Sequence, residues 1–433
     1  MAGSDFSYFA YDFLTGRPLG QLPFRGVSFG QQLDTAGQMS ATLDLDDPRI
    51  GATDPLNGTA PNRTFIVVDY LGAIVWGGVV LTRKRSVDSS LSSTTRALDI
   101  QCSELWAWMS SRIQATDYSA PPFSGITGSS RMAYWDAGPI GGPWDATLIA
   151  AQVISDALTH SVSLPITNGN PLNGLGLLVN GAAPSASAPV MTPLDYVDVN
   201  YPFTSTQTIG TIVSQLAQLG LGVGFDFGVD LAYSAGPGSA PVATINISYP
   251  VRGRTFAQSQ LVLDVTTARR YEFPEDGTQT ANQAYEVGGA GAIVVDKAQA
   301  PENQGYALWE RVFSRANIQS ASIQNLLGQI GRSDLALNAY APVTPTATLS
   351  VADPNLPLGS YIVGDNVEVR IPQYAEGLDA NGDLALYDPR FPAGLTQEWR
   401  IVQWQATVAD AGDSTVQYTF NQPPFAEPLA PAI

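Results

Sequence analysis

The chain has 433 residues and carries 39 acidic against 21 basic residues, a formal net charge of −18. Phosphate binding needs clustered Lys and Arg, so this balance disfavours a nucleic-acid-binding protein, although an acidic wall would let DNA pass without sticking to it. The single His (His160), the single Cys (Cys102) and two Lys are too few for a Cys/His metal centre or an intrachain disulfide, and leave one candidate base for a His-dependent triad. Carboxylate chemistry survives that count, so an enzyme is disfavoured rather than excluded.

The composition indicates a folded protein that contacts other subunits. Hydrophobic residues make up 44% of the chain, enough for packed cores, whereas charged residues make up only 14%, against roughly 25% in typical soluble domains. A surface with so little charge is typical of one that meets other subunits. The start MAGSDFSYFAYDF lacks the basic and apolar regions of a signal peptide, and no apolar run reaches the roughly 20 residues of a membrane helix. We therefore expect no direct membrane insertion.

Residues 1–113 predict a first β-barrel domain. Apolar and polar residues alternate along Gln38–Asp44, as in a half-buried strand, and Thr64–Tyr70 with Ala73–Thr82 form a candidate hairpin. Gly77-Gly78 inside the second hairpin strand predicts a bulge or bend that lets a sheet curl into a barrel. Further strands are expected at Phe6–Phe13, Gly26–Gly30 and Ala97–Cys102, and a short exit helix at Glu104–Ile113.

Residues 114–268 predict an inserted α/β domain. The clearest helix of the chain is Ser205–Leu219, where apolar residues recur at helical spacing before Gly220. Another helix is expected to begin at Asp145 and to end near His160, where a cation suits the helix dipole. The remaining segments are a mostly loop stretch at Ser163–Pro202 and strands at Val223–Phe227 and Ala243–Tyr249.

Residues 269–422 predict a second β-barrel domain with a helical insertion at 305–339, and residues 423–433 a C-terminal arm. The insertion is expected to hold helices at Ala307–Arg315 and Ser322–Ala339. Strands are expected at Asn282–Gly288, Ala292–Lys297, Thr346–Ala352, Asn366–Ile371, Glu398–Ala409 and Ser414–Phe420. The predicted fold is therefore mainly β within the α+β class, with two tube-like β-barrel domains, an inserted α/β domain and helical segments.

Four segments follow one another in an order that resembles a known family. They are FRGVSFGQQLDTAGQMSATLDLDDPRI, TFIVVDYLGAIVWGGVV, YIVGDNVEVRI and EWRIVQWQATVADAGDSTVQYTF, with the α/β insertion between the second and the third. The series, which covers most of residues 5–422, resembles the tail-hub proteins of long-tailed phages of actinobacteria. These are minor tail proteins similar to the baseplate hub of contractile phages. The motif residues, which we also expect to make structural contacts between subunits, are Gly37, Ser40, Thr42, Leu43, Val75, Trp76, Gly77, Gly78, Gly364, Asp365, Val367 and Val369.

The resemblance implies a virion protein at the distal end of the tail. In such a family the chain forms a homotrimer whose two barrels per chain build a pseudo-hexameric ring, which adapts sixfold to threefold symmetry and conducts DNA during ejection. The implied partners are a distal tail protein, a tape-measure protein and other tail-tip or receptor-binding proteins, while DNA passes without specific binding. The chain ends soon after the second predicted barrel, so we expect any wall-degrading activity in another protein. No catalytic, cofactor-binding or metal-ligating residue is predicted.

Two acidic segments imitate metal sites. Asp44, Asp46 and Asp47 could form a cluster, but a strand end running into a turn before Pro48 is the favoured interpretation. Asp379–Asp383 imitates the start of a calcium loop. Its sixth position holds Leu384 instead of glycine and its twelfth Arg390 instead of a carboxylate, so an exposed loop is favoured.

A carbohydrate-binding or glycoside-cleaving tail-tip β-protein is the alternative function. Glu272, Glu275 and Asp276, beside Tyr271 and Phe273, could supply paired carboxylates, although a solvated linker is favoured. Five tryptophans could form a sugar platform, although core or subunit packing is favoured for Trp76, Trp106, Trp108, Trp399 and Trp404. A third option is a tail-tube or baseplate-wedge component. Gly288–Gly291 resembles a phosphate loop only superficially, and we expect a turn between strands there.

Overall fold

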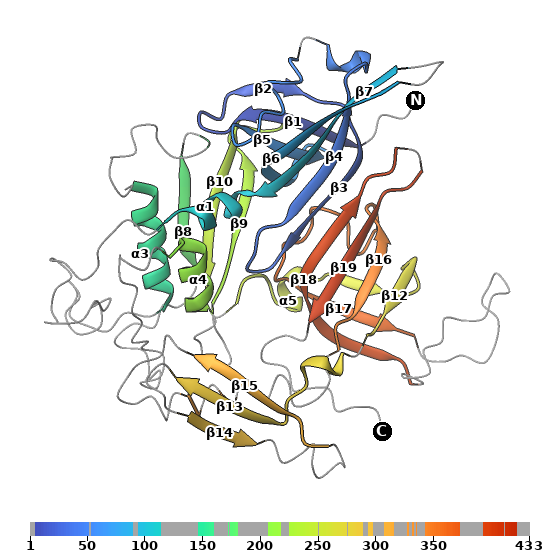
Figure 1. Cartoon of the computed structure of the whole chain (residues 1–433). Helices are drawn as coiled ribbons and strands as arrows, with labels where there is room; N and C mark the ends of the chain where they lie inside the picture. Colours follow the sequence, from blue (N-terminus) through green and yellow to red (C-terminus); the bar gives the residue numbers. More distant parts are fainter. Residues whose placement is uncertain are drawn as a thin grey trace, which may run out of the picture.

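The structure is a computed structural model, in which the described part of the chain forms three β-sheets with a few helices (Figure 1). It describes residues 5–51, 53–89, 94–113, 146–159, 172, 174–180, 207–217, 225–249, 251–274, 276–288, 293–297, 307–315, 327–328, 331–332, 335, 343–372, 393–410 and 412–421. The prediction of a mainly β fold is confirmed. Among the helices of these residues, none is long and apolar enough to cross a bilayer.

Within these residues, the largest sheet has 13 strands, which come from the N-terminal and the C-terminal regions of the chain. Its first strand set is β1 (Phe6–Asp12), β2 (Pro18–Gln21), β3 (Phe24–Gln32), β4 (Gln38–Asp44), β5 (Thr64–Tyr70), β6 (Ala73–Ser89) and β7 (Thr94–Glu104). Its second strand set is β11 (Val262–Asp264), β12 (Arg270–Glu272), β16 (Thr346–Ser350), β17 (Asn366–Ile371), β18 (Leu395–Thr407) and β19 (Thr415–Asn421). Most of the strands predicted in both regions are therefore present.

The two strand sets meet in a seam where β3 pairs antiparallel with β18, from Gln32 opposite Gln403 to Ser28 opposite Thr407 (Figure 1). The path of paired strands begins at β12 and ends at β2. The closed barrels expected from the sequence are therefore not formed within the described chain, and the sheet is open. Strand β11, which falls inside the predicted insertion, pairs in parallel with β17 and so belongs to the main sheet.

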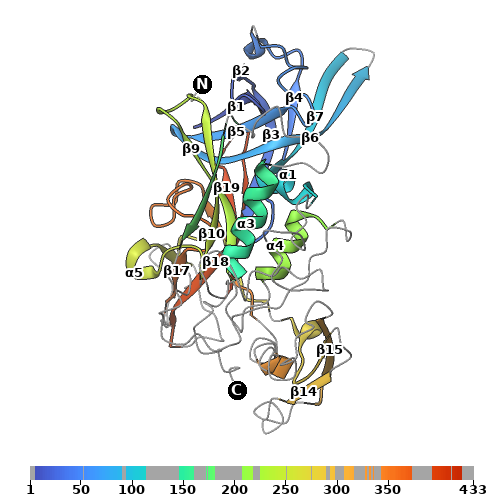
Figure 2. The same cartoon turned by 90° about the vertical axis from the view of Figure 1, so that its left-hand side faces the viewer.

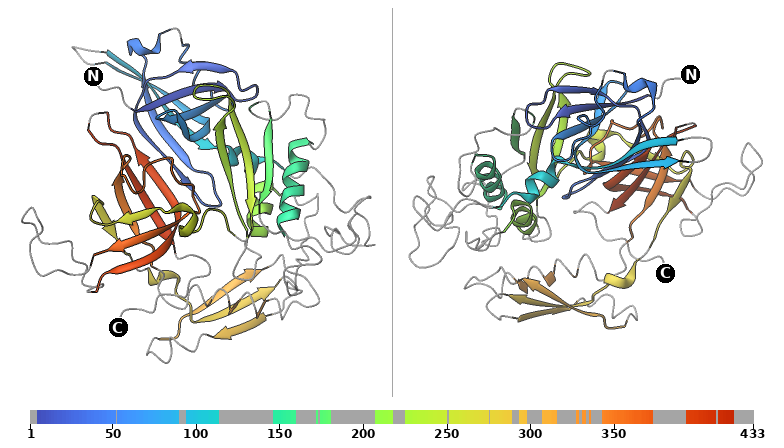
Figure 3. Two further views of the ribbon diagram at one scale, coloured as in Figure 1. Left: turned by 180° about the vertical axis from the view of Figure 1, so that it is seen from behind. Right: turned by 45° about the horizontal axis from the view of Figure 1, so that its top comes forward.

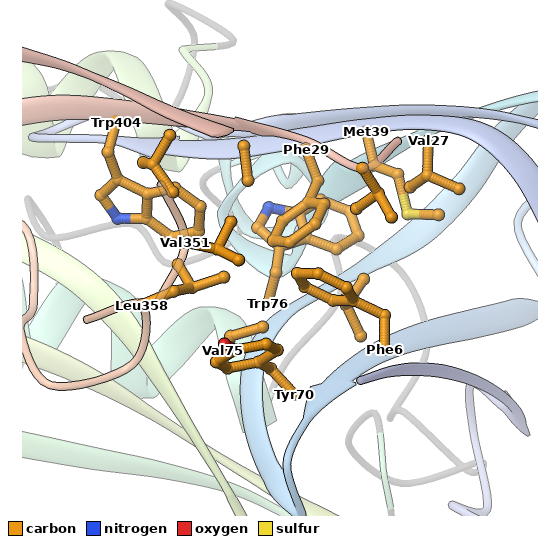
Figure 4. Packing of buried hydrophobic residues seen from close by; sticks show 14 of the residues in the cluster. Phe6, Val27, Phe29, Met39, Tyr70, Val75, Trp76, Val351, Leu358 and Trp404 are labelled. Atoms are coloured by element: carbon orange, nitrogen blue, oxygen red, sulfur yellow. The ribbon is translucent and has the colours of Figure 1, made fainter. Parts of the chain in front are cut away.

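One apolar core spans both strand sets. Figure 4 shows Phe29, Trp76 and Trp404, from β3, β6 and β18, packed together. The rings of Phe29 and Trp404 meet edge to face with centroids 5.7 Å apart, across the seam. Such contacts add to the stabilisation that the buried area itself provides. The strand sets are thus held together by shared apolar packing as well as by backbone pairing.

Strand β5 is buried along its whole length because it separates two cores. Side chains alternate across a strand, so Ile66 and Val68 face the core of the main sheet whereas Phe65 and Val67 face a second core. This is why its sequence TFIVVDY is almost continuously apolar. The second core lies between the first strand set and the α/β unit.

The α/β unit packs a small sheet against helices (Figure 2). In the sheet, β10 (Pro241–Ser248) lies between β8 (Leu175–Asn180), to which it is parallel, and β9 (Asp226–Tyr233), to which it is antiparallel. The helices are α1 (Leu105–Ser111), α3 (Ala146–Thr159) and α4 (Ile209–Ala217). The predicted helix at Ser205–Leu219 is confirmed in α4, whose apolar residues at helical spacing are buried. Asp145 and His160, the predicted ends of the other helix, lie outside the described residues.

The third sheet has the order β14-β13-β15 and lies away from the N-terminal strand set (Figure 3). Its strands are β13 (Gln283–Gly288), β14 (Ile293–Lys297) and β15 (Glu310–Arg315). The predicted helix at Ala307–Arg315 is wrong, because this segment pairs in parallel with β13 and its exposure alternates as in a strand. Of the predicted helix Ser322–Ala339, the few described positions are helical.

Candidate functional site

The predicted contact residues fall mainly in the interior of the chain. Ten of the twelve are buried; the exceptions are Ser40, which is exposed, and Thr42, which is half-buried and donates to Asp99 Oδ1 at 2.8 Å. Trp76 is fully buried, and its indole N–H donates to the carbonyl of Gly30 at 2.9 Å. A Cβ on Gly37 would lie 2.0 Å from the same carbonyl oxygen. These motif residues therefore build the fold, and contacts between subunits through them stay a prediction.

The Gly364-Asp365 motif fastens the segment that leaves the α/β unit. Gly364 has φ +108 and Gly253 has φ +99, and a Cβ on Gly364 would lie 2.4 Å from the carbonyl oxygen of Arg252. Only glycine permits this approach of two backbones. Asp365 is fully buried and accepts hydrogen bonds from the backbone N–H of Arg254 at 2.7 Å and from its guanidinium. The motif thus holds residues 251–255 against the start of β17.

Beside this motif lies a group of buried and half-buried charged residues, contributed by the first strand set, the α/β unit and the second strand set. From the first strand set, Asp34 lies between β3 and β4, and Glu104 is the last residue of β7. The other members are Asp226 and Asp230 on β9, Arg252 after β10, and Arg400 on β18. We call this group the junction cluster, which consists of Asp34, Glu104, Asp226, Asp230, Arg252 and Arg400.

Arg400 is the central cation of the junction cluster. It is 5% exposed, forms an ion pair with Asp226, and donates to the carbonyls of Gly364 at 3.1 Å and Arg252 at 2.8 Å. Arg252 in turn forms an ion pair with Asp230, and its backbone N–H donates to Asp226 Oδ2 at 2.6 Å. A Cβ on Gly228 would overlap the Arg252 guanidinium, which explains a glycine in the middle of β9.

Two carboxylates of the junction cluster have no ion pair within the described chain. Glu104 is 8% exposed and accepts from the backbone N–H of Gly37 at 2.6 Å and from the Gln31 amide at 2.9 Å. Burial raises the pKa of Glu104 to about 7. Asp34 accepts from the backbone N–H of Phe227 at 2.8 Å, and burial together with the nearby Asp226 raises its pKa as well. Sequence reasoning missed this cluster, since its members are far apart along the chain and follow no spacing.

The carboxylates of the acidic segment Asp44–Asp47 form ion pairs with arginines. Asp47 caps a 3-10 turn (Pro48–Ile50) by accepting from the backbone N–H of Arg49 at 2.9 Å, and it forms ion pairs with Arg49 and Arg25. These hydrogen bonds lower the pKa of Asp47. Asp46 forms an ion pair with Arg96. The predicted strand end and turn are present, and the described residues hold no group of three or more metal-type ligands.

The other segments considered for sugar or phosphate binding have local structural roles where they are described. Glu272 is exposed and forms an ion pair with Arg270, while Asp276 accepts from the backbone N–H of Thr278 at 2.9 Å. β13 and β14, on either side of the glycine-rich segment, pair antiparallel, and the turn predicted between them stays a prediction. Glu275, residues 289–292 and the Asp379–Arg390 segment lie outside the described residues.

Four of the five tryptophans considered for a sugar platform pack inside the protein. Trp76, Trp106, Trp399 and Trp404 are at most 4% exposed. Trp106 packs on Phe227 with ring centroids 4.5 Å apart, and the half-buried Trp108 contacts Phe13. The prediction of core packing is confirmed for the four buried residues, and none of them offers a ring face to a glycan.

The chain has the fold of phage tail proteins. No protein-family model matches it, and no curated protein matches it in sequence. Among solved structures, it is similar to the 43 kDa tail protein of prophage MuSo2 from Shewanella oneidensis, with 11% identity and a TM-score of 0.58 over 98% of this chain and 100% of that one. It is also similar to a tail protein from Neisseria meningitidis MC58, with 9% identity and a TM-score of 0.52 over 96% of each chain.

Proposed function

We propose that this chain is a structural protein of a phage tail and forms the hub at the distal end of the tail. The observation that carries the proposal is the likeness of nearly the whole chain to the MuSo2 tail protein, with no large part of either chain left over. The buried positions of the candidate aromatic residues support a structural role, and we include no enzymatic activity in the proposal. Membership in the hub proteins of actinobacterial phages is also part of the proposal.

The ring is proposed from the arrangement of the two strand sets. One chain contributes two sets of comparable size to one continuous sheet, so three chains would supply six sets around an axis. The sheet ends in the short strands β12 (Arg270–Glu272) and β2 (Pro18–Gln21), whose outer backbone groups could pair with neighbouring subunits. Such a homotrimer would adapt the sixfold symmetry of a tail tube to a threefold tip.

Conduction of DNA is proposed from the net charge. At −18, the chain would repel phosphate and let DNA slide through a ring without specific binding. The proposed partners are a second and third copy of the chain, a distal tail protein, a tape-measure protein and other tail-tip or receptor-binding proteins. Of the motif residues, the exposed Ser40 and the half-buried Thr42 on β4 are the candidates for contact with them.

The oligomeric state and the place in the virion test the proposal. Light scattering of the purified protein is expected to give three times the chain mass of 45.8 kDa. Imaging of virions with an antibody against the chain is expected to label the tail tip. A protein that is monomeric at every concentration, together with virions whose tails the antibody does not label, would contradict the hub. If that monomer cleaves cell-wall glycan, the carbohydrate-active alternative is favoured.

A further inference from the structure

The junction cluster contains more negative than positive charge. Its four carboxylates face two guanidinium groups, and the adjoining pair of Arg254 and Asp365 is balanced, so it does not offset the excess. Charges removed from water are costly unless they are paired. When the first strand set, the α/β unit and the second strand set pack together at this cluster, the excess negative charge must therefore be neutralised, or it destabilises their packing.

We propose that the junction cluster is a proton-linked clasp, which takes up a proton at Glu104 as the first strand set, the α/β unit and the second strand set close on one another, and releases it as they open. Asp34 supplies a second, more exposed position of the same kind. The proposal concerns the chain itself and does not depend on its role in a tail.

The hydrogen bonds of Glu104 fit a protonated carboxyl group. One oxygen accepts from the backbone N–H of Gly37, which suits either charge state. The other lies 2.9 Å from the amide of Gln31, and an amide can present either its NH₂ donor or its oxygen acceptor to a partner. When Glu104 is protonated, the Gln31 amide can turn and accept the new O–H, so no buried polar group loses its partner.

The charged groups around the two carboxylates do not remove the excess. The positive charge of Arg252 favours the ionised form of Glu104, and the negative charge of Asp230 disfavours it. Arg252 already forms an ion pair with Asp230. Asp34 is near Arg252 and Arg400, but also near Asp226, which is paired with Arg400. Among the groups that the structure describes, no cation is left to neutralise Glu104, and a proton can do so without moving these elements.

The sign of the pH dependence follows from the raised pKa of Glu104 in the closed state. An exposed Glu has a pKa of about 4.3. Between that value and about 7, the closed state holds a proton that the open state has lost, so opening becomes more favourable as the pH rises. The opening equilibrium should change by about tenfold per pH unit for each proton, and should level off above about pH 7.

The backbone amides of Gly37 and Phe227 donate to Glu104 and Asp34, so their hydrogen-exchange rates measure how often the junction opens. Hydrogen exchange by mass spectrometry would follow peptides that contain Gly37 and Phe227, with each rate divided by that of the unstructured chain at the same pH. In the wild-type protein the protection should fall between about pH 5 and 7 by tenfold or more per pH unit. Glu104→Gln mimics the protonated group, so the fall in protection should be about tenfold smaller per pH unit than in the wild-type protein. At pH 8 the Gly37 peptide of this variant should be better protected than that of the wild type.

Glu272→Gln is the matched control, because Glu272 is exposed and paired with Arg270 outside the cluster, and its profile should follow wild type. A wild-type profile without the slope, or a Glu104→Gln profile as steep as wild type, overturns the proposal. If Glu104→Gln does not fold, infrared spectroscopy of the wild-type protein decides instead. The carbonyl band of a protonated carboxylic acid that is present at pH 6, disappears by pH 8.5 and persists in an Asp34→Asn variant supports the clasp at Glu104, and its absence at pH 6 rejects it.

Discussion

The seam between the strand sets and the junction cluster hold parts of the same chain together by opposite means. At the seam, β3 pairs with β18 over an apolar core in which Phe29 and Trp404 are at most 2% exposed. At the junction, the α/β unit is fastened by buried ions around Arg400. Apolar packing is indifferent to pH and contributes wherever surfaces meet, whereas buried ions contribute only when each is paired. The seam should therefore govern overall stability, and the junction should govern how stability responds to solution conditions.

The largest effect is expected from emptying the seam core. Trp76→Ala should lower the free energy of unfolding by about 3 to 5 kcal/mol, because it leaves a cavity beside Phe29. It also deprives the Gly30 carbonyl of the indole donor. Urea unfolding at pH 7 measures the change. Trp76→Phe should cost less because it keeps an aromatic ring, and equal losses for the two variants would contradict the role of cavity formation.

A smaller loss is expected when the central ion pair of the junction is broken. Arg400→Met should cost about 3 kcal/mol, because Asp226 would keep a buried, unpaired charge. The double variant Arg400→Met with Asp226→Asn removes both charges and should be more stable than Arg400→Met alone. Urea unfolding of the wild type, both single variants and the double variant gives the coupling energy. A coupling energy near zero would show that the ion pair does not fasten the junction.

The close backbone approach at Gly364 should produce the next effect. Gly364→Ala should cost about 2 to 3 kcal/mol, since it adds a Cβ near the Arg252 carbonyl to a residue with positive φ. Gly412 has φ +91 with open space around it, so Gly412→Ala carries only the backbone cost, about 1 kcal/mol. The difference between the two thermal unfolding curves isolates the steric part, and identical shifts would argue against it.

The smallest effect concerns the acidic turn, which responds to pH in the direction opposite to Glu104. Since hydrogen bonds from Arg49 lower the pKa of Asp47, this residue stabilises the protein above about pH 4, and the contribution is lost as the pH falls below that value. Asp47→Asn should therefore make the loss of stability in acid less steep while leaving a small deficit at pH 7. Melting temperatures between pH 7 and pH 2 measure this. A parallel decline in both proteins would rule out the contribution.

The sequence predicted the strands best where burial follows the side-chain alternation. The predicted bounds of β4 (Gln38–Asp44), β5 (Thr64–Tyr70) and β17 (Asn366–Ile371) match the structure to the residue. Each carries its strand pattern locally, through alternation in β4 and β17 and burial on both faces in β5. The mainly β fold could be predicted for the same reason.

Prediction failed where pairing with a distant segment decides the structure. Glu310–Arg315 contains no clean alternation of polarity and was expected to be helical, but it is fixed as a strand by parallel pairing with β13. The open path of the main sheet depends on the pairing of β3 with β18, residues far apart in the chain. The junction cluster could not be predicted for the same reason, since Asp34 comes near Arg400, and Glu104 near Arg252, only in the folded chain.

The single cysteine of the chain has a practical consequence for measuring assembly. Cys102 lies in the core of the main sheet at 2% exposure, and burial raises the pKa of its thiol, so little nucleophilic thiolate is available in the folded protein. A maleimide dye added to a Ser234→Cys variant should therefore attach at this exposed position, which is not among the predicted contact residues, before it reaches the native thiol. Fluorescence transfer between labelled copies could then be recorded without engineering the native residue away.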